Sequence, residues 1–309
     1  MKHAVICIGA LLVDELYYCK QPVVAATSNP ALLKRIPGGV MRNIVHQLSL
    51  LDIPVEFITA VGNDADGQWL KETCEQAGID MSGTIMADRP TGKYAALLGP
   101  DGSLYAAACS NPCEAYLNIE LLQQQQGRLS AAKIIVADTN LEAPVLEWLI
   151  RFCKQQDTRL FIEPVSVEKA KKLAGIELDG LFMVTPNADE LPSLGKPGGS
   201  REDTISELLQ KGVQKIWLRK GKEGSEMISL ESRYSLPSPT VMVKDITGAG
   251  DGALAAWVAA YCLGRTERQC LAAAHAMAAA ILQVDGAIDP DISQQKLFNA
   301  AKTYYPDEQ

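Results

Sequence analysis

The chain has 309 residues, of which 47% are hydrophobic and 21% charged, the balance of an ordinary water-soluble globular protein. Its formal net charge is −8 at pH 7, and no segment rich in lysine and arginine offsets this charge, so a nucleic-acid partner is not expected. The eight cysteines form no CxxC pair and the three histidines lie far apart, which indicates reduced thiols in a cytoplasmic protein and argues against a zinc site.

The chain begins with MKHAVICIGALLV, a basic tip followed by an apolar run, as a secretion signal does. Asp14 and Glu15 follow this run directly, however, and no small-residue cleavage site appears. We therefore predict a buried first strand. No other segment is apolar for 18 residues, so neither a transmembrane helix nor a membrane partner is expected.

Short apolar runs alternate along the chain with longer stretches of helical periodicity. Strands are predicted over 4–9, 55–62, 133–138, 159–165, 181–186 and 215–221, and helices over 41–51, 66–77, 143–156, 167–173, 202–211, 250–263, 267–283 and 293–303. Strands that are apolar throughout and are followed by helices favour an α/β fold with a mostly parallel central sheet covered on both faces.

Two segments lack this alternation. Residues 11–36 have strand character without a following helix, and residues 91–109 are predicted to form a β-hairpin that turns at GPDG, residues 99–102. Together they are expected to form a small antiparallel sheet that stands off the main domain. Such a sheet cannot bury both of its faces alone, so it is expected to cover a site, to pair with another subunit, or to do both.

A glycine cluster, DITGAGDGA, precedes the predicted helix 250–263. The backbone N–H groups of Gly248, Ala249 and Gly250 at a helix N-terminus make an anion site, and Asp251 follows in the first helical turn. One interpretation is a structural turn with an N-terminal Asp cap. The other is a phosphoryl-transfer site in which Asp251 takes a proton from the attacking hydroxyl group.

Other motifs place polar residues or glycines at the ends of predicted strands. Each has a purely structural interpretation as well, namely a turn before a helix, a solvated acid or an N-capped helix. These candidate residues are Gly38, Gly39 and Asn43 in IPGGVMRNIVHQL, Asp14 in GALLVDE, and Asn187 and Glu190 in TPNADEL.

The motifs PGGVMRN, AVGNDADG, TPNADE, KGKEG and DITGAGD occur in an order and spacing that resemble the ribokinase-like (PfkB) family of ATP-dependent carbohydrate and nucleoside kinases. The resemblance covers essentially the whole chain. It implies one kinase domain over 1–309, a three-layer α/β/α sandwich, with a lid formed by about 11–36 and 91–109. The segments SNPALLKRIPGGVMRNI, VADTN and EPVS most resemble pseudouridine kinases within the family.

The resemblance also implies roles for individual residues. Asp251 would be the catalytic base, and the N–H groups of Gly248, Ala249 and Gly250 would stabilise the transferred phosphoryl group. Sugar hydroxyls would be held by Asp14, Gly38, Gly39 and Asn43, and ATP by Asn187, Glu190, Arg219, Gly221, Gly224, Gly250 and His275. Glu190 would act mostly through magnesium-bound water. His275 either lines the adenine pocket or packs between helices.

Arg219 departs from the family pattern, because this position is often held by a small hydroxyl residue; an arginine here is able to contact phosphate. Many relatives also bind a monovalent cation, for which Asp245, Thr247 and Gly286 are the candidates here. The segment VDGAIDPD, residues 284–291, differs from the potassium-responsive pattern, so activation by K⁺ stays open.

Two asparagines are candidates for reading the extra N–H of a C–C-linked uracil ring, because an amide both donates and accepts. Asn140 in VADTN is one, with its neighbour Thr139 as an alternative, and Asn29 in SNP is the other. Asn29 has a second interpretation, in which it only starts a turn before Pro30.

The function expected from these observations is Mg-ATP-dependent phosphorylation of the primary hydroxyl of pseudouridine, by a homodimer paired through the lid. One alternative is a kinase of another nucleoside or of a free sugar such as ribose, fructose or 2-keto-3-deoxygluconate. A second is a sugar-binding relative without turnover. A Rossmann dehydrogenase and a P-loop kinase are excluded, because neither GxGxxG after the first strand nor GxxxxGK[ST] occurs.

Overall fold

In the computed structural model, which describes residues 5–308, the central sheet has eight strands in the order β14-β13-β12-β11-β10-β9-β1-β4. Six neighbouring strands, β4, β1, β9, β10, β11 and β12, run parallel. Strands β13 and β14 are added antiparallel at the β12 edge. Their bounds are β1 Val5–Ile8, β4 Val55–Ile58, β9 Ile134–Asp138, β10 Arg159–Glu163, β11 Met183–Val184, β12 Lys215–Arg219, β13 Ser225–Ile228 and β14 Arg233–Leu236.

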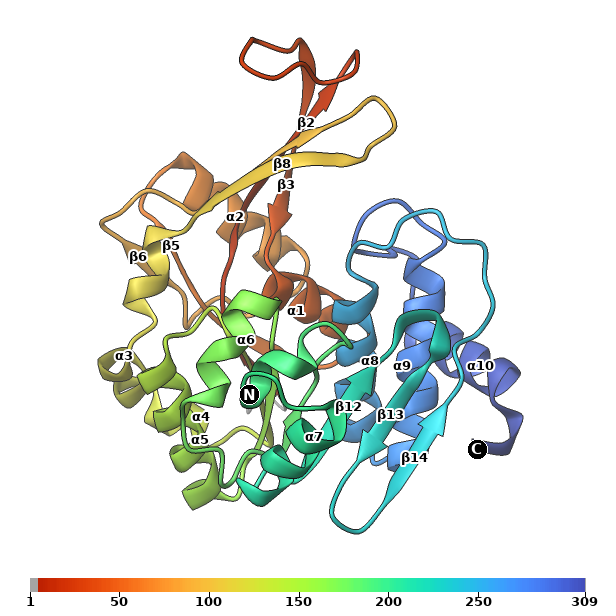
Figure 1. Cartoon of the computed structure of the whole chain (residues 1–309). Helices are drawn as coiled ribbons and strands as arrows, with labels where there is room; N and C mark the ends of the chain where they lie inside the picture. The colour runs from red at the N-terminus through yellow and green to blue at the C-terminus, as the bar shows by residue number, and fades with distance from the viewer. Residues whose placement is uncertain (1–4, 309) are drawn as a thin grey trace.

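Helices cover both faces of this sheet. The α-helices of the described chain are α1 Val40–Leu50, α2 Ala65–Gln76, α3 Ile119–Gln124, α4 Gln126–Leu129, α5 Ala143–Gln156, α6 Val167–Ala174, α7 Arg201–Gln210, α8 Ala249–Cys262, α9 Glu267–Ile281 and α10 Gln294–Tyr304. Short 3₁₀ turns lie at Pro112–Tyr116, Leu191–Leu194, Gly221–Glu223 and Pro306–Glu308. Figure 1 shows α8, α9 and α10, in blue, gathered together beside the sheet.

Alternate residues along the strands face two separate apolar cores. Val5 and Cys7 of β1 belong to the core formed with α1, α8 and α9, whereas Ile6 and Ile8 belong to the core formed with α5, α6 and α7. Strands buried on both faces explain why the sequence shows continuous apolar runs. The expected α/β fold, a three-layer α/β/α sandwich, is therefore confirmed.

A separate four-stranded sheet rises from the main body (Figure 1, top). It consists of β2 Leu12–Cys19, β3 Ala31–Gly38, β7 Lys93–Leu98 and β8 Leu104–Ser110, in the order β3-β2-β7-β8. We refer to these four strands as the lid sheet. They come from the two segments in which the sequence lacks helical alternation. The β2–β3 and β7–β8 pairs are antiparallel, as expected, but the central pair β2–β7 is parallel, so the sheet is mixed.

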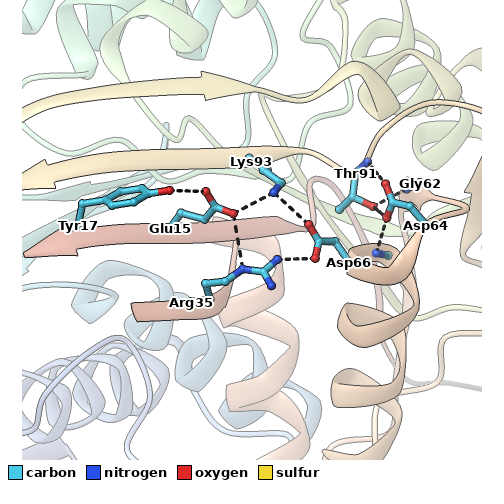
Figure 2. Close-up of polar contacts among 9 residues, drawn as sticks. Glu15, Tyr17, Arg35, Gly62, Asp64, Asp66, Thr91 and Lys93 are labelled. Carbon is cyan, nitrogen blue, oxygen red and sulfur yellow. Dashed lines mark hydrogen bonds and ion pairs between the residues drawn. The ribbon is translucent and has the colours of Figure 1, made fainter. Parts of the chain in front are cut away.

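Ion pairs join the lid sheet to the start of α2 (Figure 2). Glu15 of β2 contacts Lys93 of β7 at 2.9 Å and Arg35 of β3 at 3.5 Å. Asp66 of α2 contacts the same two cations, Lys93 at 3.1 Å and Arg35 more closely. We call these four residues the lid anchor. Tyr17 of β2 adds a hydrogen bond of 3.1 Å from its hydroxyl group to Glu15.

The predicted strand 55–62 divides into β4 and β5 (Ala60–Gly62), and β5 pairs with β6 (Ile85–Ala87) in a small parallel sheet. The division occurs at Thr59, whose hydroxyl group donates to the Gly9 carbonyl at 2.8 Å. The antiparallel strands β13 and β14 were not predicted. Residue 4 of the predicted strand 4–9 lies outside the described residues. Within residues 5–308, no helix is long and apolar enough to cross a membrane.

Candidate active site

The N-terminus of α8 is built for close approach to its backbone. Gly248 precedes the helix with φ 74°, and a Cβ atom there would lie 2.4 Å from the Cβ of Ala287, so only glycine fits. No side chain caps α8, although Asp64 caps α2 and Ser200 caps α7. The first N–H groups of α8 thus have no side-chain acceptor, and the helix dipole adds positive potential at this point.

Asp251 lies in the first turn of α8 and accepts a hydrogen bond of 2.8 Å from the amide of Asn43 on α1. Burial raises the pKa of Asp251 to about 7; the Asn43 bond opposes this shift, and the nearby carboxylate of Glu163 adds to it. A carboxyl group that titrates near neutral pH is suited to proton transfer. The two residues come from helices that are far apart in sequence, and the fold brings their side chains into contact.

Gly38, Gly39 and Asp14 lie together before α1. A Cβ atom on Gly38 would lie 2.1 Å from a carboxylate oxygen of Asp14, and one on Gly39 would lie 2.5 Å from the Ala10 carbonyl oxygen, where φ is 108°. Gly39 therefore requires glycine, whereas a side chain on Gly38 would displace the Asp14 carboxylate. Burial raises the pKa of Asp14 to about 6, while the positive charge of Arg42 opposes the rise.

A cavity of about 580 Å³ opens beside the α8 N-terminus. Its walls are mainly apolar, and Ala249 and Gly250 lie at the edge of it. The other lining residues include Trp217, Gly221, Gly224, Val241, Val243, Ile246, Ala253, His275, Ala278 and Leu282. A cavity of this size with apolar walls and a helix N-terminus at one side matches a nucleotide base with its phosphates.

Gly221, Gly224 and His275, which were expected to contact ATP, all line this cavity. Gly224 has φ 87°, and a Cβ atom there would lie 2.0 Å from the Leu236 carbonyl oxygen. Both ring nitrogens of His275 have partners, Nε2 with the Ser225 hydroxyl group at 2.8 Å and Nδ1 with the Tyr305 hydroxyl group at 2.9 Å. Burial lowers the pKa of His275 to about 4, so the ring is neutral at pH 7. These contacts favour the packing interpretation of His275.

Arg219, at the end of β12, uses its guanidinium group inside the protein. It donates to the carboxylate of Glu163 at 2.7 Å and to the carbonyl oxygen of Gly250 at 3.2 Å. The Glu190 carboxylate lies 3.9 Å away. Arg219 also lines the cavity; its two terminal nitrogens donate to these protein oxygens, while its Nε is buried without a hydrogen-bond partner.

The side chains of Asn187 and Glu190 each accept a hydrogen bond from the backbone N–H of the other residue. The side-chain oxygen of Asn187 accepts from the N–H of Glu190 at 2.8 Å, and the Glu190 carboxylate accepts from the N–H of Asn187 at 2.9 Å. This reciprocal pair resembles a capping box, as the structural interpretation requires, but a 3₁₀ turn follows in place of an α-helix. Burial raises the pKa of Glu190.

The cation candidates Asp245, Thr247 and Gly286 also lie together. One Asp245 oxygen accepts from the N–H of Thr247 at 2.9 Å and from its hydroxyl group at 2.7 Å, and the other accepts from the N–H of Gly286 at 2.9 Å. Asp245 thus ties the glycine cluster to the loop after α9. Within residues 5–308, no group of three or more His, Cys, Asp or Glu side chains is arranged to hold a metal ion.

The two specificity candidates lie in different places. Asn140 is buried at the end of β9, and its side-chain oxygen accepts from the ammonium group of Lys169. Asn29 lies in the loop between β2 and β3, where its amide bonds both the N–H and the carbonyl of Val24 at 2.9 Å. Because its amide holds this loop together at the outer end of the lid sheet, Asn29 fits the turn interpretation and is not brought together with Asp251 in this chain.

Three further polar residues at this end of the sheet were not identified as site candidates. Asp138 ends β9, Glu163 ends β10 and Thr185 follows β11. The carboxyl ends of parallel strands meet at one edge of a sheet, and ligands bind there. In the sequence, each of the three is a polar residue at the end of an apolar run. Only the order of the strands in the sheet shows that they lie side by side.

A family model and a curated relative each match most of this chain. The model of the pfkB family of carbohydrate kinases matches residues 2–294. A pseudouridine kinase of Escherichia coli (strain K12) is 28% identical over 299 residues, covering 94% of this chain and 94% of that protein.

Solved structures are similar over nearly the whole chain. Arabidopsis thaliana ribokinase complexed with ribose and ATP has a TM-score of 0.85 at 20% identity and covers 98% of this chain and 99% of that one. A putative ribokinase II from E. coli in complex with ATP and Mg²⁺ has a TM-score of 0.82 at 19% identity, with coverages of 97% and 99%. These likenesses confirm a ribokinase-like fold.

Proposed function

The chain belongs to the pfkB family of carbohydrate kinases, which makes it a phosphotransferase with an alcohol group as acceptor, and from this premise we propose that it transfers the terminal phosphoryl group of ATP to the 5′-hydroxyl of pseudouridine. The observation that carries the proposal is Asp251. Its carboxyl group lies in the first turn of α8, at the uncapped N-terminus beside the cavity, and titrates near neutral pH.

In the proposed reaction, Asp251 accepts the proton of the acceptor hydroxyl group as that oxygen attacks the phosphoryl group. The N–H groups of Gly248, Ala249 and Gly250 stabilise the negative charge on the transferred group. The amide of Asn43 keeps the Asp251 carboxylate oriented at 2.8 Å. ATP occupies the cavity beside α8, with its phosphates toward Gly250.

Magnesium supplies charge neutralisation on the phosphates when bound, and the buried carboxylate of Glu190 suits a water-mediated contact with it. Asn187 keeps Glu190 in place through their reciprocal hydrogen bonds. A monovalent cation such as K⁺ would be held near Asp245, Thr247 and Gly286, with backbone carbonyl groups as ligands.

The acceptor is held by the residues before α1. Asp14 and Asn43 bind sugar hydroxyl groups, while the absence of side chains on Gly38 and Gly39 lets the sugar approach the backbone. Asn140, at the end of β9, contacts the base. Pseudouridine is proposed as the substrate because of the motifs around these residues and the similarity to a pseudouridine kinase.

The test is ATP-dependent phosphorylation of a panel comprising pseudouridine, uridine, adenosine, ribose, fructose and 2-keto-3-deoxygluconate, with Mg²⁺ and with or without K⁺. A clear preference for pseudouridine over uridine is expected. Turnover of a free sugar alone would keep the kinase assignment and discard pseudouridine, an outcome that the similarity to a ribose-bound ribokinase makes worth including. Turnover of no acceptor, with ATP still bound, would favour a sugar-binding relative without activity.

We further propose that residues 1–309 form a single kinase domain, that the lid sheet closes over the acceptor, and that two subunits pair through their lid sheets. Exposed apolar side chains on the lid sheet, Leu32, Leu33, Leu104 and Tyr105, support the pairing. A cytoplasmic location is proposed because the cysteines are unpaired thiols and most of them are buried.

A further inference from the structure

We infer that Glu163 and Arg219 form a positioning pair for the proposed phosphoryl transfer, in which Glu163 orients the Arg219 guanidinium group and Arg219 fixes the backbone and the charge beside Asp251. The inference rests on the proposed function, because it names residues that act through Asp251. Neither residue is assigned a contact with the acceptor.

Glu163 is a rigid partner for Arg219. Its side chain, 4% exposed, ends β10, and one oxygen accepts from the hydroxyl group of Thr185 at 2.6 Å, while the other accepts from Arg219 at 2.7 Å. Thr185 follows β11, the strand between β10 and β12, so the contacts cross three neighbouring strands. A buried carboxylate with both oxygens bonded holds its cation in one geometry.

Arg219 transmits this geometry to α8. Its guanidinium group donates to the Gly250 carbonyl at 3.2 Å, and a Cβ atom on Gly250 would lie 2.8 Å from the same nitrogen, so glycine permits the close approach. The peptide unit is planar. Holding the Gly250 carbonyl therefore also orients the N–H of Asp251 and the start of the helix that carries its carboxyl group.

The pair also sets the charge around Asp251. The groups that face its carboxyl from other elements are Asn43 of α1, Asp138 of β9, Glu163 of β10 and Arg219 of β12. The negative charges of Glu163 and Asp138 raise the pKa of Asp251, whereas Arg219 and the Asn43 hydrogen bond lower it. From α9, the apolar side chains of Met277 and Ile281 occupy the space that a Cβ atom on the neighbouring Gly252 would enter.

The pair explains a departure in the sequence. Arg219 stands where the resemblance leads us to expect a small hydroxyl residue, and an unpaired guanidinium group buried among protein atoms would be costly. Glu163 supplies the matching charge from β10. The ion pair makes Arg219 compatible with the fold, and the Gly250 contact connects it to the catalytic helix.

The test measures the pKa of Asp251 directly in the protein without ligands, by NMR of ¹³Cγ-labelled aspartate. The signal is assigned by its absence from the Asp251→Asn variant. Glu163→Gln should lower this pKa, because it removes a nearby negative charge, and Arg219→Met should raise it, because it removes a nearby positive charge. Each shift should be about one unit. The double variant should return close to the wild-type value. The acid limb of the kcat/KM profile against pH should move in the same directions.

Lys220→Met is the matched control, because Lys220 is the next residue along and pairs with Glu226 on β13 at 2.7 Å. It should leave the pKa of Asp251 unchanged. If Arg219→Met does not fold, as judged by thermal unfolding, Arg219→Lys replaces it; it keeps the charge and should preserve the pKa but lower kcat through loss of the fixed geometry. Shifts of equal sign in Glu163→Gln and Arg219→Met, or no shift in either, would overturn the inference.

The NMR readout separates this inference from the proposed function. Opposite shifts in a protein that phosphorylates none of the acceptors would support the pair and count against the kinase reaction. Turnover with no change in the pKa of Asp251 in any variant would support the reaction and reject the pair.

Discussion

Asp251 is the base of the proposed reaction, and its burial opposes its ionisation. Burial is the main cause of its raised pKa, and nearby Glu163 and Asp138 add to it. A catalytic base that is half protonated near neutral pH loses activity when the pH falls. The environment of one side chain thus determines the working pH range of the proposed reaction.

The first prediction concerns this range. The value of kcat/KM should fall as the pH decreases through about 7, because Asp251 acts only in its ionised form and its pKa is raised to about 7. Initial rates between pH 5 and pH 9, at saturating ATP, would show the acid limb. An acid limb near the ordinary aspartate pKa, about 4, would contradict the assigned environment.

The second prediction concerns stability. A pKa raised from 3.8 to about 7 means that ionising Asp251 disfavours the folded state, so the stabilising effect of its proton is present below pH 4 and is lost as the pH rises through 7. Asparagine does not ionise, so Asp251→Asn avoids this loss of folding stability at high pH. The loss is on the order of a few kcal/mol, since each unit of pKa corresponds to about 1.4 kcal/mol.

Thermal unfolding of both proteins at pH 4 and at pH 8 tests this. The difference in Tm between variant and wild type should become more favourable to the variant at pH 8. A difference that does not change with pH would show that Asp251 titrates normally. Asp138→Asn should change Tm with pH in the same direction, because burial also raises the pKa of Asp138 to about 7.

At this scale the sequence identified most of the assembled residues. Gly248, Asp251, Asn43 and Asp14 were found because glycines before helices and acids after strands have a local pattern. Glu163 was not, because its importance depends on Arg219, a partner two strands away in the sheet.

At the scale of elements, the lid anchor is the connection with the clearest consequence. Asp66 of α2 binds Arg35 and Lys93, which come from two lid strands (Figure 2). Its neighbour Asp64 caps α2 through the N–H of Gly67 at 2.8 Å and accepts from the hydroxyl group of Thr91 at 2.6 Å. The motif AVGNDADG therefore fixes the base of the lid sheet to the helix beneath it.

The third prediction is that Asp66→Asn raises KM for the acceptor with little effect on kcat, because the lid sheet, which we propose closes over the acceptor, loses a fixed attachment to α2. The increase should be about five-fold at most, since partly exposed ion pairs contribute up to about 1 kcal/mol. High salt should produce a similar increase in the wild type and a smaller one in the variant.

Glu75→Gln is the control, because Glu75 forms its ion pair with Lys71 at 2.9 Å within the same helix. It should leave KM unchanged. An equal effect of both variants would mean that loss of any surface charge on α2 is responsible, and the lid anchor would have no specific role.

Most elements were predictable because their signals are local. The eight predicted helices were located within two residues of their observed ends, because apolar periodicity and capping residues mark them, whereas the short helices α3 and α4 were not among them. The pairing of β2 with β7 in parallel was not, because strand direction within a sheet depends on how distant segments meet. The short strands β13 and β14 carry a mixed polar and apolar pattern and were missed for that reason.

At the scale of the whole molecule, the alternation of apolar strands and helices was enough to predict the three-layer sandwich. The lid sheet stands off this sandwich and exposes apolar side chains. Its strand β8 is exposed along its whole length, and Leu104 and Tyr105 in it are 58% and 55% exposed. Exposed edge strands with apolar side chains favour association.

The fourth prediction is that the protein is a homodimer paired through the lid sheets. Size-exclusion chromatography with light scattering should give about twice the chain mass of 33.3 kDa. Leu104→Asp should shift the protein toward the monomer by placing a charge in the apolar surface. Leu230→Asp is the control, because Leu230 is 80% exposed outside the lid sheet. A 33.3 kDa species alone in the wild type would contradict the pairing.

The central claim is that this fold performs phosphoryl transfer with Asp251 as the base. The most direct test compares the wild type with Asp251→Asn in ATP-dependent phosphorylation of pseudouridine, and measures ATP binding to both by calorimetry. We predict turnover by the wild type, a loss of about 10²-fold to 10⁴-fold in the variant, and ATP affinities that agree within a few-fold. Turnover by the variant within a few-fold of the wild type would contradict the account.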